Sequence, residues 1–241
     1  MLDGEFEAMG VIKNYNDFVT ALLDAGFSMS VGGGDGIYSV LPWGWDEPPP
    51  YSTPVRWHTG DPDTDPWEWR MRVLEERDDV AYAKLFFKKS GFIAREWYPY
   101  FLSARRGGLC LEDAYYGGAV SNAAKRVYDA ICANGALPLH AIKQIAGLST
   151  EDSSKVDAAL NSLQMGMYIT ICGRQQKLSK QGLEYGWYST VFTRVEDFWG
   201  AEIIDDSERV GNDEAVRAIT DRILTLNPSA DKKKIARFIQ G

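Results

Sequence analysis

The chain has 241 residues and a formal net charge of −8, with 45% hydrophobic and 25% charged residues. These proportions are ordinary for a globular protein, and the 12% of aromatic residues excludes an intrinsically disordered chain. Residues 1–119 hold 11 basic and 19 acidic residues, whereas residues 120–198 hold 8 and 7. A basic surface in the middle segment must therefore come from local clustering.

Cysteine usage and the first ten residues predict a cytoplasmic protein. The three cysteines, Cys110, Cys132 and Cys172, are few, far apart and odd in number, which fits a reducing compartment. Residues 1–10 carry three acidic and no basic residues, the reverse of a secretory signal. The apolar runs are too short to span a membrane, so we expect no membrane partner.

Residues 1–110 are predicted to form an aromatic-rich α+β subdomain. A first helix is expected after an N-cap at Asn16 and before Gly26. Residues 27–31 and 37–41 flank a glycine run and are interpreted as a β-hairpin. The run could instead cradle a phosphate, but no helix follows it directly and no Gly-Lys-Ser/Thr is present. The hairpin is therefore the favoured interpretation.

Residues 42–66 are rich in Pro, Asp and Trp and predict a long irregular loop whose tryptophans pack on the body. Asp65-Pro66 with Glu68 three residues after Asp65 predicts a capped helix start. The helix is expected to run to about Arg77, with an inward stripe of Trp67, Met71 and Leu74.

A strand is predicted over residues 80–87, followed by a turn at 88–91, a return at 92–93 and an aromatic helix over 95–105. Lys84 on that strand can bind a phosphate or carboxylate, or can cover apolar surface with its stem. Several tryptophans can stack on an extruded base, although core packing is the usual role of such residues. The pocket predicted on this basis contains Trp67, Trp69, Tyr82 and Lys84.

Residues 109–118 are interpreted as a linker, and the segment 120–195 is predicted to be a winged-helix module. Amphipathic helices are expected from Val120 to Asn134, from about Leu137 to Gly147, and over Glu151–Met165 after Thr150. A strand over 167–172, a polar stretch over 173–182 and a strand over 184–192 complete a hairpin. This order of elements is that of a winged helix.

In such modules the third helix enters the major groove of DNA and the hairpin contacts phosphates. The third helix offers polar side chains, although Glu151, Asp152 and Asp157 are unfavourable beside phosphates. The hairpin carries three cations without an acidic residue between Gly173 and Gly182, and a solvated hairpin tip is the alternative interpretation. The predicted nucleic-acid contacts are Ser153, Ser154, Asn161, Arg174, Gln175, Gln176, Lys177 and Lys180.

Other sites that depend on short motifs are not predicted. The chain has two histidines, His58 and His140, and contains neither Cys-x-x-Cys nor His-Glu-x-x-His, so we expect no metal site. No Gly-x-Ser-x-Gly elbow is present. We accordingly expect no cofactor.

Two parts of the sequence resemble bacterial proteins described as AlkZ-related: Pro66-Trp67-Glu68-Trp69-Arg70 continuing through residues 79–91, and residues 120–192. AlkZ proteins are bacterial DNA glycosylases with tandem winged helices, which excise alkylated bases and unhook interstrand crosslinks. The resemblance therefore implies a winged-helix fold and a role in DNA repair.

The resemblance also implies which residues to look for. In AlkZ proteins a Gln-apolar-Gln or Gln-apolar-Asp tripeptide near the N-terminus positions the attacking water. This sequence lacks it, so no catalytic residue can be transferred. Glu68 could activate water, but its position in the predicted helix cap gives it a structural role. The glutamines here all come late, at Gln144, Gln164, Gln175, Gln176, Gln181 and Gln240.

Two helices are predicted over residues 196–241, Asp213–Leu226 and Ala230–Ile239. The second carries Lys232, Lys233 and Lys234, either a further cationic contact or a solvated face. We expect a protein that binds double-stranded DNA, relates to DNA-repair glycosylases and lacks their motif. The alternatives are a glycosylase with an unorthodox site, and a winged-helix module that binds itself or another protein.

Overall fold

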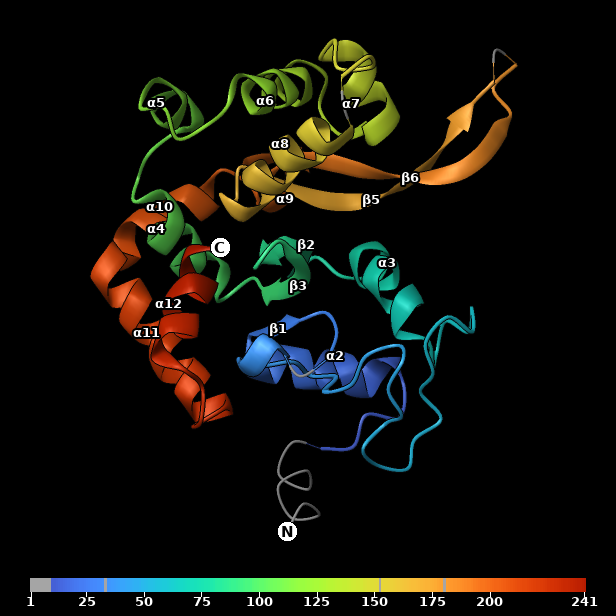
Figure 1. Cartoon of the computed structure of the whole chain (residues 1–241), viewed down its shortest axis with the longest axis vertical. Helices are drawn as coiled ribbons and strands as arrows, with labels where there is room; N and C mark the ends of the chain where they lie inside the picture. The colour runs from blue at the N-terminus through green and yellow to red at the C-terminus, as the bar shows by residue number, and fades with distance from the viewer. Residues whose placement is uncertain (1–9, 33, 152, 180) are drawn as a thin grey trace.

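The computed structural model describes residues 10–32, 34–151, 153–179 and 181–241. Residues 1–9, Gly33, Asp152 and Lys180, which the sequence predictions invoked, lie outside these ranges. The described part combines helices with one antiparallel sheet, ordered β1-β3-β2-β5-β6-β4 (Figure 1). Its strands are β1 (Phe27–Met29), β2 (Val80–Phe86), β3 (Lys89–Ala94), β4 (Leu137–Pro138), β5 (Ile169–Leu178) and β6 (Glu184–Arg194).

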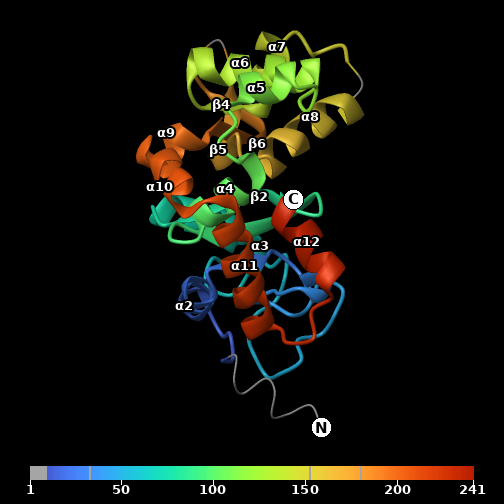
Figure 2. The same ribbon diagram turned by 90° about the vertical axis from the view of Figure 1, so that its left-hand side faces the viewer.

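Some helices lie above and below the sheet, and the C-terminal helices lie along its left side in Figure 1 (Figures 1 and 2). In chain order they are α2 (Tyr15–Ala25), the short 3-10 helix η2 (Gly34–Gly36), α3 (Pro66–Glu76), α4 (Tyr98–Arg106), α5 (Leu111–Tyr116), α6 (Asn122–Asn134), α7 (Leu139–Ile145), α8 (Ser153–Met165), α9 (Val195–Trp199), α10 (Glu202–Val210), α11 (Asn212–Leu226) and α12 (Lys232–Gln240). None of the described helices is both long enough and apolar enough to cross a membrane.

The N-cap of helix α2 lies two residues earlier than predicted. The side chain of Asn14, not Asn16, accepts a hydrogen bond from the Asp17 amide, which satisfies one of the free N–H groups at the helix start. The helix ends as predicted at Gly26, in the left-handed conformation with a φ of 87°. A Cβ there would lie 2.2 Å from the Trp97 ring, so this end needs glycine on both counts.

The predicted hairpin of residues 27–31 and 37–41 is wrong. Strand β1 pairs with β3 instead, with Phe27 opposite Ile93. Residues 37–41 return beside β1 as irregular chain, held by a bond from the Met29 amide to the Tyr38 carbonyl and one from the Val40 amide to Ser28 Oγ. The apolar edge of β3 buries β1 in the core, which a local two-stranded hairpin would not achieve.

Loop 42–66 and helix α3 largely follow the predictions. Trp43 is buried in the core. Asp65 caps α3 by accepting from the Trp67 amide, and its carboxylate also accepts from two loop amides. Of the predicted inward stripe, Met71 is buried and Leu74 packs half-buried on the core, but Trp69 is the inward tryptophan, because it stacks on Phe18 of α2. Trp67 is 41% exposed instead.

The middle segment shows the predicted order of helix, short helix, helix and hairpin. Helix α6 ends at Asn134 and Gly135, and α8 buries Val156, Leu160 and Leu163 at the predicted spacing. Strand β5 reaches further along the polar stretch than predicted, to Leu178, whereas β6 begins at the predicted Glu184 and ends two residues later than predicted. The predicted linker 109–118 is wrong in part, because α5 forms there with Cys110 and Asp113 as a capping box.

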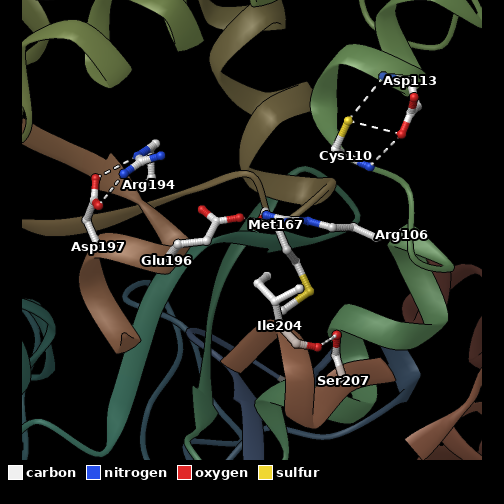
Figure 3. A network of polar contacts seen from close by, with 9 residues as sticks. All are labelled: Arg106, Cys110, Asp113, Met167, Arg194, Glu196, Asp197, Ile204 and Ser207. Atoms are coloured by element: carbon white, nitrogen blue, oxygen red, sulfur yellow. Dashed lines mark hydrogen bonds and ion pairs between the residues drawn. The ribbon is translucent and has the colours of Figure 1, made fainter. Parts of the chain in front are cut away.

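One sheet joins the predicted N-terminal subdomain to the middle segment, since Tyr82 of β2 pairs with Ile171 of β5. Beside this junction the buried Arg106 of α4 forms an ion pair of 2.9 Å with Glu196 and donates to the Met167 carbonyl (Figure 3). The division into three domains stays a prediction. What the structure adds is a polar contact that fixes the base of the hairpin to α4.

The C-terminal helices pack on α4 and the sheet. The ring of Phe238 on α12 stacks on Phe86 of β2, with centroids 3.9 Å apart and planes 6° from parallel. Helices α11 and α12 begin near the predicted residues. Helices α9 and α10 were not predicted, because they are short and lack a side-chain cap.

Candidate nucleic-acid interface

The β5–β6 hairpin has a buried base and a projecting outer half. At the base Ile171 pairs with Phe192, and both side chains are at most 7% exposed. The register shifts between Ile171 and Gly173, and beyond this bulge the ribbon extends past α7 and α8 (Figure 1). The outer half therefore presents most of its side chains to solvent.

A second bulge lies in the outer half, at Gly186. Gln175 faces Ser189 and Lys177 faces Tyr185, so residues 186–188 oppose the single residue Gln176. Gly186 has a φ of +76°, and its carbonyl accepts a 2.8 Å hydrogen bond from the Gln176 side chain. Bulges of this kind change the direction of the side chains that follow.

The residues at the bulge are exposed aromatics that sequence reasoning missed. Trp187 is 95% exposed, and Tyr185 and Tyr188 are more than half exposed. Trp187 and Tyr188 belong to the bulge itself, where the regular alternation of strand side chains is interrupted. The available signal was Gly186 inside a run of aromatics, because an interior glycine in a strand often marks a bulge.

The predicted cations of the hairpin have different surroundings. Arg174 lies between the hairpin and α3, 3.5 Å from a Glu68 oxygen and 3.8 Å from a Glu75 oxygen. Its guanidinium carbon is 5.0 Å from the centroid of the Tyr188 ring. Lys177 is exposed on the outer half, and Lys180 lies outside the described residues. The two glutamates therefore offset the charge of Arg174, whereas Lys177 presents its charge to solvent.

The predicted contacts on α8 lie mainly on its exposed face. Ser153 and Ser154 are exposed in the first turn, and Asn161 is half-buried two turns later. Gln175 on the hairpin is exposed as well. Helix α8 packs beside β5, near the base of the hairpin from which the outer half projects (Figure 1).

The structure separates the four predicted pocket residues. Trp69 and Tyr82 are buried, and Tyr82 packs on Phe92. Trp67 is on the surface with the Arg70 guanidinium 3.3 Å from its ring centroid. Lys84 is half-buried, and its backbone amide donates to the Gln164 side chain of α8. Stacking on a base stays a prediction for this set, and of its two tryptophans Trp67 is the exposed one.

Other chemistry near the hairpin is limited. Burial raises the pKa of the Cys172 thiol to about 11, so this group at the edge of the base is a poor nucleophile at neutral pH. No group of three or more His, Cys, Asp or Glu side chains is placed to hold a metal ion within the described residues.

A cavity of about 690 Å³ lies away from the hairpin, with Asp79, Arg95 and Tyr100 in its lining. Two of its charges are paired: Asp79 with Arg77 at 2.5 Å and Arg95 with Glu202 at 3.1 Å. The hydrogen bond from Arg77 holds the pKa of Asp79 below its usual range. The carboxylates of Glu96 and Asp206 also line the cavity, so its lining is mainly acidic and does not suit a phosphate.

The hairpin and α8 thus form a surface with cations and exposed aromatics, and the comparisons with known proteins bear on the chain as a whole. The family described as AlkZ related matches residues 12–240. No curated protein and no solved structure matches the chain. The match covers nearly the whole sequence and includes both stretches on which the resemblance was based. The chain belongs to the AlkZ-related family.

Proposed function

We propose that this protein binds double-stranded DNA through a winged-helix module formed by residues 122–194. The observation that carries the proposal is the projecting outer half of the β5–β6 hairpin, with the exposed Lys177 and Trp187. Membership of the AlkZ-related family supports it, since that family suggests a relation to DNA-repair glycosylases.

The arrangement of elements supports the winged-helix interpretation. Helices α6, α7 and α8 precede the hairpin, and the two-residue strand β4 between α6 and α7 pairs with β6, Leu137 opposite Phe192. In winged-helix modules the third helix enters the major groove and the hairpin contacts the flanking backbone. Here α8 and the β5–β6 hairpin would take these positions.

The chemistry of the hairpin suits a duplex with an accessible or distorted base step. Exposed aromatic side chains stack on bases or wedge between them, and lysines neutralise phosphates. Trp187 is almost fully exposed, so it contributes little to the fold and is available for such a contact. Lys177, whose cross-strand partner is Tyr185, lies on the same outer half and would add the phosphate contact.

A fluorescence-anisotropy titration against duplex, single-stranded and alkylated DNA at two salt concentrations tests the proposal. We expect micromolar or tighter duplex binding that weakens steeply with salt. In a plot of the logarithm of the binding constant against the logarithm of the salt concentration, each neutralised phosphate adds about 0.9 to the magnitude of the slope. Lys177→Gln should weaken binding and flatten the slope, and Lys13→Gln, which removes one exposed cation near α2, is the matched control. Absence of binding, or binding that salt does not change, would refute the proposal.

The same titration with alkylated DNA addresses glycosylase activity. If the protein retains that activity through an unorthodox site, abasic sites will accumulate and strand breaks will appear after alkaline treatment. The tripeptide of AlkZ proteins is absent from the sequence, so we expect the alkylated DNA to remain intact.

A second candidate function is a protein-binding module, which the apolar side chains of the hairpin favour. Among the described residues, five large hydrophobic side chains are exposed on this one hairpin: Leu178, Leu183, Tyr185, Trp187 and Tyr188. Such a concentration is also found at protein interfaces. Sedimentation of the wild type and of Trp187→Ala across a concentration series tests self-association. A monomer at every concentration, with no partner captured by the hairpin, would eliminate this candidate.

A further inference from the structure

A second cationic surface lies where the β2–β3 turn meets α12, which we call the α12 patch. It comprises Lys88, Lys89, Lys232, Lys233, Lys234 and Arg237, all of them exposed. The turn packs on α12 through the rings of Phe87 and Phe238, whose centroids are 6.0 Å apart. Two segments far apart in sequence thus bring Lys89 together with Lys234 and Arg237, which a solvated lysine run on a single helix does not do.

The patch contains a hollow of about 220 Å³. Its lining consists of Asp35, Phe87, Lys89, Lys234 and Arg237. The Asp35 carboxylate accepts from Lys89 at 2.9–3.0 Å, and the Asp35 carbonyl accepts from Lys234 at 3.0 Å. These bonds hold both ammonium groups at the hollow. Three cations face one carboxylate there, so the hollow retains a net positive charge and suits an anion.

The Asp35 contacts hold the cations without neutralising them all. Lys234 bonds a neutral carbonyl and keeps its full charge. The Arg237 guanidinium carbon lies 5.5 Å from the Phe87 ring centroid, an interaction that orients the group and leaves N–H donors available. Arginine and lysine N–H groups arranged around a hollow are the usual partners of phosphate oxygens.

The patch has a fixed position relative to α8. Arg105 of α4 donates to the Met165 carbonyl at the end of α8 and to the Ile239 and Phe238 carbonyls at the end of α12. One guanidinium thus joins the C-terminal ends of the two helices, where a positive charge is favourable. The two helices lie on the same side of the molecule in Figure 2, with their ends meeting near the C-terminus. This guanidinium therefore fixes α12, and the patch on it, relative to the C-terminal end of α8.

We infer that the hollow beside α12 binds a backbone phosphate of the duplex that the hairpin and α8 contact. The inference rests on the proposed function. It assigns Lys89, Lys234 and Arg237 to the phosphodiester group and the neighbouring Lys88, Lys232 and Lys233 to long-range attraction. These contacts carry no sequence information and serve to fix the register of the protein on the DNA.

The test is a comparison of full-length variants by duplex titration over a salt series. Lys89→Gln/Lys234→Gln/Arg237→Gln removes the three cations of the hollow. Lys13→Gln/Arg209→Gln/Arg217→Gln removes three exposed cations elsewhere and has the same change in net charge. We expect the first variant alone to weaken binding equally for unrelated DNA sequences. Its log–log salt slope should fall by about 0.9 for each phosphate that the protein no longer neutralises. Urea unfolding of both variants establishes that each is folded.

The outcomes separate this inference from the proposed function. Equally weakened binding in the two triple variants, or unchanged binding in both, would overturn the α12 site, while weaker binding by Lys177→Gln would still support the hairpin. Weaker binding by the α12 variant with unchanged binding by Lys177→Gln would support the site and overturn the role of the hairpin. A wild-type protein that fails to bind any duplex would overturn both.

Inorganic phosphate distinguishes the source of the anion. We expect millimolar phosphate to compete with the duplex in the wild type and to have little effect on the α12 variant beyond ionic strength. Calorimetric binding of inorganic phosphate that disappears in the variant, with duplex affinity and salt slope unchanged, would identify a free-anion site and overturn the DNA contact.

Discussion

The two halves of the β5–β6 hairpin have the same backbone pairing and opposite surroundings. At the base, Ile171 and Phe192 are buried under helices, and the ion pair of Arg106 and Glu196 lies beside them. In the outer half, Lys177 on β5 and Trp187 on β6 are exposed to solvent. Secondary structure alone therefore does not distinguish the part that stabilises the fold from the part available for binding.

The bulges divide the two halves. A shift in register after Ile171 separates the base from the outer half, and the Gly186 bulge sets the direction of the aromatics within the outer half. The side chains of the base stabilise the fold by being buried, so their removal should destabilise the protein. Side chains of the outer half gain burial only when a partner is present. Substitutions there should change binding and leave folding almost unaltered.

The largest expected effect is at the base, from Arg106→Ala. The Arg106 and Glu196 side chains are 8% and 23% exposed, so the variant leaves a largely buried carboxylate without its partner and the Met167 carbonyl without a donor (Figure 3). Breaking a buried pair in this way costs about 3–5 kcal/mol. Urea unfolding should show this decrease in the free energy of unfolding.

The control for that prediction is Arg209→Ala. Arg209 and Asp206 form a pair of 2.8 Å with side chains 74% and 41% exposed. Exposed pairs contribute about 0–1 kcal/mol. Similar destabilisation by the two variants would mean that the base is no more dependent on its polar junction than the surface is on its ion pairs.

Trp187→Ala should have the next largest effect, on binding and not on folding. A surface side chain without packing partners changes stability by about 0.5 kcal/mol or less. A stacked base contributes about 1–3 kcal/mol to binding, so duplex affinity should fall correspondingly. Trp187→Phe, which keeps an aromatic ring, should restore most of the affinity. A destabilised Trp187→Ala variant with unchanged DNA affinity would contradict the assignment of the outer half.

The sequence predicted the elements whose determinants are local. Asp65 and Pro66 mark the start of α3, and Gly26 marks the end of α2, because caps act within one turn. The stripe of Val156, Leu160 and Leu163 located α8 for the same reason. The cations of the hairpin were predicted from a local absence of acidic side chains, and their contact with DNA stays a prediction.

The features that failed depend on contacts between distant segments. Strand β1 pairs with β3, more than sixty positions later, and no local pattern contains this choice of partner. The inward face of α3 is set by the stacking of Trp69 on Phe18. Arg174 was predicted as a free cation, but Glu68 and Glu75 reach it only because α3 lies beside β5. Charge clusters read along the sequence omit partners from other elements.

The contact of Arg174 with α3 leads to a smaller predicted effect. In Glu68→Gln/Glu75→Gln, Arg174 no longer has a carboxylate partner and becomes available to a phosphate. Stability should change by about 0–1 kcal/mol, because the groups are partly exposed. Duplex binding should tighten, and the salt slope should steepen by about 0.9 if Arg174 then neutralises one phosphate.

Net charge has to be controlled in that experiment. Glu208→Gln/Asp221→Asn removes the same charge from exposed positions on α10 and α11. A steeper slope confined to the α3 variant would show that the two glutamates hold Arg174 away from DNA. If the salt slope changes equally in the two variants, the effect comes from the net charge of the protein and not from Arg174.

The smallest effect concerns Cys172, which lies between the two halves. Burial raises the pKa of its thiol to about 11 from an ordinary 9.0, so the folded state keeps the proton between these values. The unfolded state loses the proton first, and this group's contribution therefore lowers stability as pH rises through that window.

Because the thiolate is the reacting form, iodoacetamide at pH 8 should label the exposed Cys110 well before Cys172, as peptide mass spectrometry can show. Cys172 labelling should quicken as pH rises toward 11, and also at pH 8 in Arg106→Ala, where the base opens more often. Equally fast labelling of both thiols in the wild type at pH 8 would show that Cys172 is accessible and belongs to the outer half. The buried base of the hairpin would then end at Ile171.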